Sequence, residues 1–167
     1  MKNRICFGSI GVIHTPFTVH TGTPVQSALS ATEGRAEVFP EYAEGLADLE
    51  GFSHIILVYH FHRSRGFHLA QRPLLDPSKN RGIFAIRHYR RPNPIGISIV
   101  RIRKISSCFI EFTGADMLDG SPLLDIKPFI GLFDNREDTV DGWFDTCPRP
   151  LPGEHHPPYD DEKEDLA

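Results

Sequence analysis

A short basic loop carries the residues best suited to chemistry in this sequence. The chain reads Arg-Pro-Asn-Pro-Ile-Gly over residues 91–96, so Asn93 stands between two prolines. Proline fixes its own φ and drives the preceding residue towards extended backbone, so the Asn93 side chain should project from a stiff loop. Such a loop needs little further ordering when a ligand binds. We predict that Asn93 aligns a polar group during catalysis, with an ordinary proline-stiffened turn as the alternative.

Basic side chains are concentrated in the middle of the chain. Residues 51–110 contain eleven Lys or Arg and a single acid, Asp76. A block this basic favours an anionic partner such as a nucleic acid, and Arg binds phosphates and carboxylates bidentately. The candidates for such contacts are Arg63, Arg87, Arg90 and Arg91. A solvated basic face, balanced by acids from elsewhere in the fold, is the alternative.

A second segment, residues 116–122, has the composition of an exposed turn. It contains Asp-Gly-Ser-Pro at 119–122, and Asp119 can accept hydrogen bonds from nearby backbone N–H groups. Capping the turn is one role for Asp119. The other is that the turn exposes backbone groups to a ligand, with Met117 and Leu118 as apolar walls. Near the start of the chain, Gln26 follows Pro24 and offers both a donor and an acceptor.

His60 and His62 are the stronger of two histidine pairs that could bind a metal, the other being His155 and His156 in the tail. The stronger pair ends a strand-like run and flanks Phe61, so its two members should share one face of the strand. Two histidines on a strand could bind a metal, as in a β-barrel hydrolase, but no third ligand follows at a suitable spacing. We therefore predict no metal, and expect one histidine to donate a hydrogen bond at the rim of a site.

Short apolar runs indicate strands rather than helices along most of the chain. Strands are predicted at 5–14, 34–39, 53–62, 83–88, 97–105, 108–113 and 123–126, with residues 105–108 as a hairpin connection. One helix is predicted over 41–49, after Pro40 and before Gly51. Regular βαβ alternation and a G-x-G-x-x-G fingerprint are both missing from the sequence. The prediction is a mostly-β fold, a single small closed or partly closed β-barrel with one or two short helices.

Length and composition set the domain organisation. With 167 residues the chain fits one domain, predicted at residues 1–146, followed by a proline-rich acidic tail at 147–167 that we expect to be disordered. No apolar run reaches the roughly 18 residues that span a bilayer, and the start does not read as a signal peptide. Three cysteines without a C-x-x-C pair indicate reduced thiols and a cytoplasmic protein.

Several of these segments together resemble the TsaA-like (YaeB, TrmO) family. The resemblance covers about residues 5–130 and its most specific parts are the last two of the following segments. They are Ile-Gly-Val-Ile-His-Thr-Pro-Phe at 10–17, Pro-x-Gln at 24–26, Gly-Phe-Ser-His at 51–54, Phe-His at 61–62, Gly-Ile-Phe-Ala-Ile-Arg at 82–87, Arg-Pro-Asn-Pro-Ile-Gly at 91–96 and Asp-x-Leu-Asp-Gly-Ser-Pro-Leu-Leu-Asp-Ile-Lys-Pro at 116–128.

The resemblance implies a small β-barrel, usually a homodimer, that binds S-adenosylmethionine without a Rossmann domain. In family members with an assigned role, the methyl group goes to N6 of threonylcarbamoyl-adenosine 37, beside the anticodon of certain tRNAs. The implied cofactor-binding residues are Pro24, Val25, Gln26, His62, Arg63, Arg87, Met117, Leu118, Asp119 and Gly120. Arg90 and Arg91 are the expected substrate-binding residues.

The chain departs from the family pattern just before the proline-braced loop. Ile86 replaces a Thr, and residues 88–90 replace a run that often contains Ser. The segment from Phe133 to Trp143 resembles the ending of short members.

The predicted function is an S-adenosylmethionine-dependent methyltransferase acting on the anticodon loop of tRNA. Because the sequence shows no general base, a non-catalytic module that binds S-adenosylmethionine or an anionic metabolite is the alternative.

Overall fold

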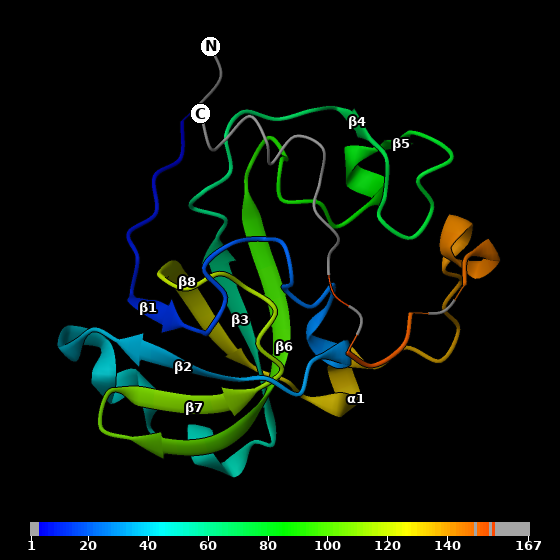
Figure 1. The fold of residues 1–167 in the computed structure, drawn as a ribbon. Coiled ribbons are helices and arrows are strands. Elements are labelled where there is room, and N and C mark those ends of the chain that lie inside the picture. Colours follow the sequence, from blue (N-terminus) through cyan, green and yellow to red (C-terminus); the bar gives the residue numbers. More distant parts are fainter. Residues whose placement is uncertain (1–3, 149, 154, 156–167) are drawn as a thin grey trace.

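Six strands close into a barrel in the computed structural model, which describes residues 4–148, 150–153 and 155 (Figure 1). The barrel order is β1-β2-β7-β6-β3-β8 and every neighbouring pair is antiparallel. The strands are β1 (Gly11–His14), β2 (Glu33–Val38), β3 (His54–His60), β6 (Ile95–Ser106), β7 (Phe109–Thr113) and β8 (Ser121–Pro128). The closed, mostly-β barrel predicted from the sequence is confirmed.

Side chains alternate between the barrel interior and its outer surface, as the period of a β-strand requires. On β3, Ile55, Leu57 and Tyr59 point into the core, and on β6 the inward positions are Gly96, Ser98 and Val100. Phe112 of β7 is a large, fully buried side chain of the same core. The inward positions of β6 therefore include a glycine and a serine where an apolar side chain is usual.

The antiparallel topology brings three long connections to one end of the barrel. β1, β3 and β7 end there, and β2, β6 and β8 begin there. The connections are residues 15–32, 61–94 and 114–120. They hold all the residues that the sequence analysis selected for the cofactor and the substrate, and Asn93. The barrel thus positions segments that are far apart in the sequence around one site.

The remaining elements lie outside the barrel. β4 (Ala70–Gln71) and β5 (Arg81–Gly82) form a small separate sheet, and β8 is followed by α1 (Gly131–Asp134) and the 3₁₀ helix η5 (Gly142–Thr146). The other 3₁₀ helices are η1 (Ser27–Leu29), η2 (Pro40–Leu46), η3 (Leu49–Gly51) and η4 (Ile83–Ala85). In the described residues the helical segments are thus more numerous than predicted, and all are short. Figure 1 shows β4, β5 and the orange segment that contains η5 outside the barrel on the same side.

Two predicted elements are wrong in type. Residues 83–88 form η4 and a loop in place of a strand. Ile83 and the next buried side chain, Ile86, are three positions apart, where a strand would bury every second residue. The helix expected at 41–49 is two 3₁₀ helices. Asp48 between them has a φ of 64°, a left-handed conformation that ends a right-handed helix.

The predicted boundary between residues 146 and 147 and the disorder of the tail remain predictions, since most of 147–167 lies outside the described residues. Where the tail is described, Gly153 N donates a hydrogen bond to Leu29 O at 3.0 Å, a typical backbone distance. His155 forms a β-bridge with Pro24. Among the described residues, no helix has the length and apolar character needed to cross a membrane.

Candidate functional site

A cavity of about 930 Å³ lies at the end of the barrel where the three connections meet. Its walls combine residues from the 15–32 and 61–94 connections with Asp116 and with the outward-facing side chains of β6. Asn93 and Arg91 line this cavity, as do Val25, Gln26 and Arg87. The structure therefore brings the predicted catalytic residue together with three predicted cofactor residues and one predicted substrate residue.

Asn93 is exposed at the cavity, on a loop whose backbone is fixed on both sides. Pro94 O accepts a hydrogen bond from Phe61 N at 2.8 Å, and Ile95 N donates to Asn93 O at 2.8 Å. Arg91 Nη1 donates to Ile86 O at 3.1 Å. Among the described residues, no hydrogen bond engages the Asn93 amide side chain. The loop thus holds a polar group towards solvent in the cavity, as its two prolines predict.

Asp116 is the functional residue that the sequence reasoning missed. Its Oδ1 accepts a hydrogen bond from Ser98 Oγ at 2.5 Å, and Tyr59 Oη lies 3.1 Å from Ser98 Oγ. Because Ser98 has one hydroxyl proton and gives it to Asp116, Tyr59 must donate to Ser98. In the sequence Asp116 is separated from the predicted strand at 108–113 by Gly114 and Ala115, and no motif partner there marks it for a role.

The environment of Asp116 favours its protonated form. Burial raises the pKa of Asp116 to about 6, against the opposing effects of hydrogen bonds from Ser98 and the Ser27 backbone and of the Arg87 charge. Burial and the charge of Asp116 also raise the pKa of Tyr59, so the phenol stays protonated. A carboxyl group with a pKa near neutrality, in a cavity, is suited to accept and release a proton.

Aromatic rings form one wall of the cavity and anchor the segment before Asn93. The ring of Tyr89 stacks on the rings of His20 and His88, with centroid separations of 4.1 Å and 4.4 Å. The ring of Phe61 meets Tyr89 edge-on, with its centroid 6.5 Å away. Ile86 and residues 88–90, where the chain departs from its family pattern, are all buried. Arg90 is 8% exposed, while Arg91 is partly exposed and lines the cavity. The substrate-binding roles of both arginines remain predictions.

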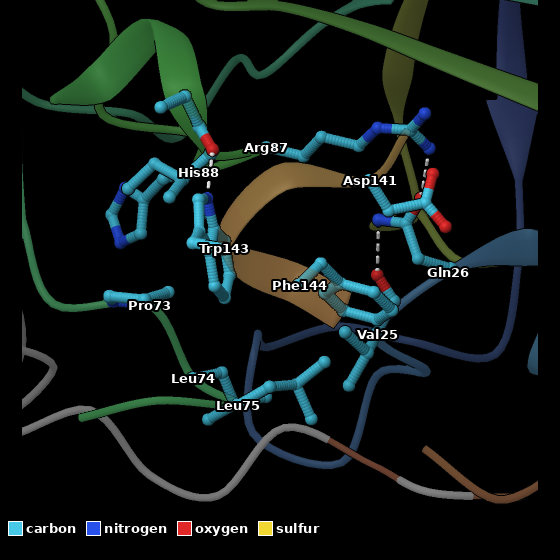
Figure 2. Close-up of a pocket in the computed structure, with 12 residues that line it drawn as sticks. Val25, Gln26, Pro73, Leu74, Leu75, Arg87, His88, Asp141, Trp143 and Phe144 are labelled. Carbon is cyan, nitrogen blue, oxygen red and sulfur yellow. Dashed lines mark hydrogen bonds between the residues drawn. The ribbon is translucent and has the colours of Figure 1, made fainter. Parts of the chain in front are cut away.

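Val25, Gln26 and Arg87 connect the large cavity to a neighbouring one of about 400 Å³ (Figure 2). Arg87 Nη1 donates to Gln26 Oε1 at 2.6 Å, and Gln26 Nε2 donates to Val25 O at 2.7 Å. These bonds fix the orientation of the Gln26 amide. The three residues predicted to bind a cofactor therefore form one connected unit between the two cavities.

A second group of predicted cofactor residues lies around a hollow of about 30 Å³. His62, Arg63, Met117 and Leu118 line it, and it shares His20, Thr23, Phe61 and Asp116 with the large cavity. Burial and the nearby charge of Arg63 lower the pKa of His62, which favours a neutral imidazole. Arg63 Nη1 donates a hydrogen bond to Thr18 O at 2.6 Å. The large cavity thus adjoins both groups of predicted cofactor-binding residues.

Pro24, Asp119 and Gly120 do not line any of these three cavities. Asp119 Oδ1 accepts a hydrogen bond from Thr15 N at 3.1 Å, and Asp119 N donates to Phe17 O at 2.7 Å. Its carboxylate therefore ties the 114–120 connection to the residues after β1. Gly120 has a φ of 75°, which a glycine adopts without strain. Their cofactor roles remain predictions.

Among the described residues, no group of three or more His, Cys, Asp or Glu side chains is arranged to hold a metal ion. His60 ends β3, and His62 N folds back to donate to His60 O at 2.8 Å. The two histidines predicted to share a strand face are therefore separated by a turn. His62 faces the small hollow, where it meets Met117 and Leu118.

Comparison with known proteins places this architecture in a family. The family model described as the tRNA-methyltransferase O N-terminal domain matches residues 12–135. The chain belongs to the tRNA-methyltransferase O N-terminal domain family. This match spans all six barrel strands except the first residue of β1, and it includes both the Asn93 loop and Asp116. The resemblance stated from the sequence is confirmed.

Relatives within this family carry two kinds of name. A probable S-adenosyl-L-methionine-binding protein of Pyrococcus abyssi is 49% identical over 142 residues, which cover 84% of this chain and 77% of that protein. The tRNA (adenine(37)-N6)-methyltransferase of Escherichia coli is 30% identical over 152 residues, covering 85% of this chain and 65% of that enzyme. A crystal structure of TrmO from Pseudomonas aeruginosa superposes with a TM-score of 0.74 at 32% identity, covering 88% of this chain and 66% of that one. The chain thus spans slightly less than two thirds of these two longer members.

Proposed function

We propose that this protein is an S-adenosylmethionine-dependent methyltransferase that modifies N6 of adenosine 37 in tRNA. The observation that carries the proposal is the 930 Å³ cavity, in which the exposed Asn93 amide and the Asp116 carboxyl line one space. Family membership and the name of the Escherichia coli relative support the choice of reaction. A threonylcarbamoyl group on N6, as the family resemblance implies, would present a carboxylate to Arg91.

The residues around the cavity fit S-adenosylmethionine. A nucleoside with an amino-acid chain needs apolar and aromatic contacts and a cation for its carboxylate, and the cavity lining supplies Phe61 and Arg87 for these roles. Its volume lies within the range of pockets for ligands of this size. When bound, S-adenosylmethionine supplies an electrophilic methyl group on a sulfonium. Arg87 and Gln26 would hold the cofactor at the wall that the two cavities share.

In the proposed mechanism, two residues act on the adenine nitrogen. The N6 lone pair is delocalised into the ring, so N6 attacks well only when its geometry and its proton are controlled. The Asn93 side-chain amide hydrogen-bonds the substituent on N6 and orients the nitrogen. The Asp116 carboxylate takes up the N6 proton as the new N–CH₃ bond replaces the S–CH₃ bond. Charge is balanced, since the sulfonium becomes a neutral thioether and Asp116 becomes a neutral acid.

The rim of the cavity suits a polyanion. Arg63 and Arg87 on the 61–94 connection are exposed. Arg87 lines the cavity and Arg63 lines the adjoining small hollow. Their charges would contact the phosphates of an anticodon loop and make binding strongly dependent on salt. Since tRNA is found in the cytoplasm, we propose that the protein acts there.

A homodimer is part of the proposal. The outward positions of β6, which we call the β6 stripe, are Ile95, Ile97 and Ile99, and all three are exposed. A contiguous exposed apolar surface of this kind marks an interaction site. The same three side chains line the large cavity. A second copy packed on the stripe would therefore cover apolar surface and close one side of the site.

Transfer of radiolabelled methyl to bulk tRNA tests the proposal. Purified protein with labelled S-adenosylmethionine should label tRNA, and protein boiled before the assay should not. The alternative function, a module that binds S-adenosylmethionine without chemistry, is favoured by the name of the Pyrococcus abyssi relative. Calorimetric binding of the cofactor with no label in tRNA from several sources would establish that alternative.

A further inference from the structure

The 400 Å³ cavity is completed by residues that the family match does not include. The match ends at residue 135, whereas Asp141, Trp143 and Phe144 line this cavity. They come from the segment around η5, which lies opposite Pro73, Leu74 and Leu75 of the 61–94 connection (Figure 2). The cavity also shares Val25, Gln26 and Arg87 with the large cavity. A chain ending at residue 135 would lack one wall of it.

The indole of Trp143 is held in a fixed orientation. Its Nε1 donates to Ala85 O at 2.8 Å, and Phe144 meets it edge-on at 5.8 Å. The Arg81 guanidinium lies over the ring, 5.0 Å from its centroid, and is itself paired with Asp76 at 2.6 Å. Arg81 does not line the cavity, so it occupies the ring face away from the cavity. The other surface of the indole is available to a ligand.

The lining combines flat apolar surfaces with one acceptor at the edge. Leu74, Leu75 and Val25 face Trp143 and Phe144 across the cavity in Figure 2. At the edge beside Gln26 lies the Asp141 carboxylate, which is exposed and, when ionised, can only accept hydrogen bonds. The Gln26 amide is already used by Arg87 and Val25. A planar ring with an amino group at its edge matches this arrangement.

We propose that this cavity binds an adenine ring, stacked on Trp143, with its exocyclic amino group donating to Asp141. The proposal deepens the methyltransferase function and rests on it, because the cofactor carries an adenine ring. The target base is the competing occupant that the experiment separates, since its N6 is placed beside Asn93 and Asp116 in the large cavity. Hypoxanthine and guanine have a carbonyl oxygen at the same ring position, which an ionised carboxylate repels. Stacking on a tryptophan is strong and tolerant of ring type, so Asp141 supplies the selectivity.

The chain contains one tryptophan, so its emission reports this cavity alone. The test titrates the full-length protein with S-adenosylhomocysteine, S-inosylhomocysteine and homocysteine, and follows both tryptophan fluorescence and heat. S-adenosylhomocysteine should quench the emission with the affinity seen by calorimetry. S-inosylhomocysteine should bind more weakly, and homocysteine should leave the emission unchanged. An anticodon stem-loop RNA with adenosine at position 37, and one with inosine there, form the second arm.

Quenching by S-adenosylhomocysteine assigns the ring to the cofactor. Quenching by the adenosine stem-loop alone, with less by the inosine one, assigns it to the RNA base. If calorimetry shows binding of both ligands while the emission stays constant, the cavity proposal is wrong and the methyltransferase function stands. If neither ligand binds and tRNA is not methylated, both proposals are wrong.

Variants separate stacking from the fold. Trp143→Ala should weaken binding of the quenching ligand about tenfold to hundredfold, and Trp143→Phe should restore most of that loss. Asp141→Asn should reduce the preference for adenine over hypoxanthine without abolishing binding. Phe67→Ala, which removes an exposed aromatic ring outside the cavity, is the control and should bind normally. Equal affinity in Trp143→Ala and the wild type would contradict stacking.

Discussion

The hydroxyl of Ser98 donates to Asp116 at 2.5 Å and thereby links two segments that are separate in the sequence. Ser98 lies on β6, just after the Asn93 loop, and Asp116 begins the turn that contains Met117 and Leu118. Ser98 points into the barrel, so the bond is partly buried, and Tyr59 supports it from β3 at 3.1 Å. The proposed proton acceptor is thus positioned by the strand that follows the loop of the proposed aligning residue.

Replacing Asp116 by Asn should separate its chemical role from its structural one. The amide keeps the shape and still accepts the Ser98 bond, but it cannot take up a proton. We expect kcat for methyl transfer to fall about 10²- to 10⁴-fold, with the dissociation constant of S-adenosylmethionine changed much less. Asp125→Asn, on a carboxylate that pairs with Lys127 on the barrel surface, is the matched control and should be fully active. Full activity of Asp116→Asn would exclude it as the proton acceptor.

The pH dependence of the rate should show the titration of the same carboxyl group. With the pKa of Asp116 at about 6, kcat should rise with pH through that value and level off above it. A pH–rate profile measured with bound substrate checks this. The rise should be absent from the residual activity of Asp116→Asn. A flat wild-type profile between pH 5 and pH 8 would contradict the assignment.

Protein stability should respond to pH in the opposite direction. The folded-state pKa of Asp116 is raised above that of an unfolded aspartate, so the folded protein binds this proton more tightly. The contribution of Asp116 is therefore complete below the unfolded pKa and is lost as the pH rises through about 6. At pH 8, Asp116→Asn should melt at the same temperature as the wild type or higher, in a thermal unfolding measurement. A variant that is inactive and strongly destabilised would indicate a structural role.

Asn93→Ala should lower turnover while leaving the cofactor site intact. The Asn93 amide is exposed in the large cavity and its loop is fixed by backbone bonds, so truncation removes a polar group without moving the loop. We expect at least a tenfold loss in kcat and a small change in S-adenosylmethionine affinity, measured by methyl transfer and calorimetry. Asn80→Ala, on an exposed residue away from the cavity, controls for loss of an amide. Unchanged turnover would remove Asn93 from the mechanism.

Gly96→Ala should disturb the site through the core. A Cβ at Gly96 would lie 2.4 Å from a ring carbon of Tyr59, so the ring must move away from Ser98. Overpacking of this kind costs about 1–3 kcal/mol in the free energy of unfolding. Gly34→Ala is the matched control, since its Cβ would lie 2.6 Å from Phe112 in the same core but away from Ser98. Chemical denaturation should show similar losses in both, and only Gly96→Ala should also lose activity at a temperature where both are folded.

Much of this fold could be predicted from the sequence, because strand alternation and turn residues are local signals. The barrel, the hairpin at 105–108 and the pairing of Asp125 with Lys127 at 2.7 Å were all accessible in this way. The stiff Asn93 loop was accessible too, since proline acts on its own neighbours. Ile83 and Ile86 were misassigned because their burial depends on tertiary packing. Runs of apolar residues do not reveal whether the chain turns between them.

The site was predicted less completely than the fold. Asp116 could not be assigned a role, because its hydrogen bond to Ser98 spans 18 residues and follows from barrel closure. Asp119, predicted either to cap the turn or to face a ligand, accepts a hydrogen bond from Thr15 N, 104 residues away, and its cofactor role stays a prediction. Trp143 and Asp141 belong to a segment whose contacts with the 61–94 connection leave no periodic pattern. Distances across a closed barrel are set by strand order, which a single sequence does not display.

Ile97→Lys should prevent self-association if the β6 stripe is the dimer interface. Ile97 is the most exposed of the three stripe residues, and a charge there would be buried by a second copy without a partner. Light scattering after gel filtration should show a dimer for the wild type and a monomer for this variant. Val140→Lys, an exposed position outside the stripe, should remain dimeric. A monomeric wild type would show that the stripe has another partner or none.

The most direct measurement of the central claim locates the transferred methyl group. The protein is incubated with tRNA and S-adenosylmethionine carrying a deuterated methyl group, and the tRNA is then digested to nucleosides for mass spectrometry. The proposed mechanism predicts the labelled methyl on N6 of an adenosine derivative from position 37, with the label lost in Asp116→Asn. Label on another atom or nucleoside, or none at all while the cofactor binds by calorimetry, would contradict it.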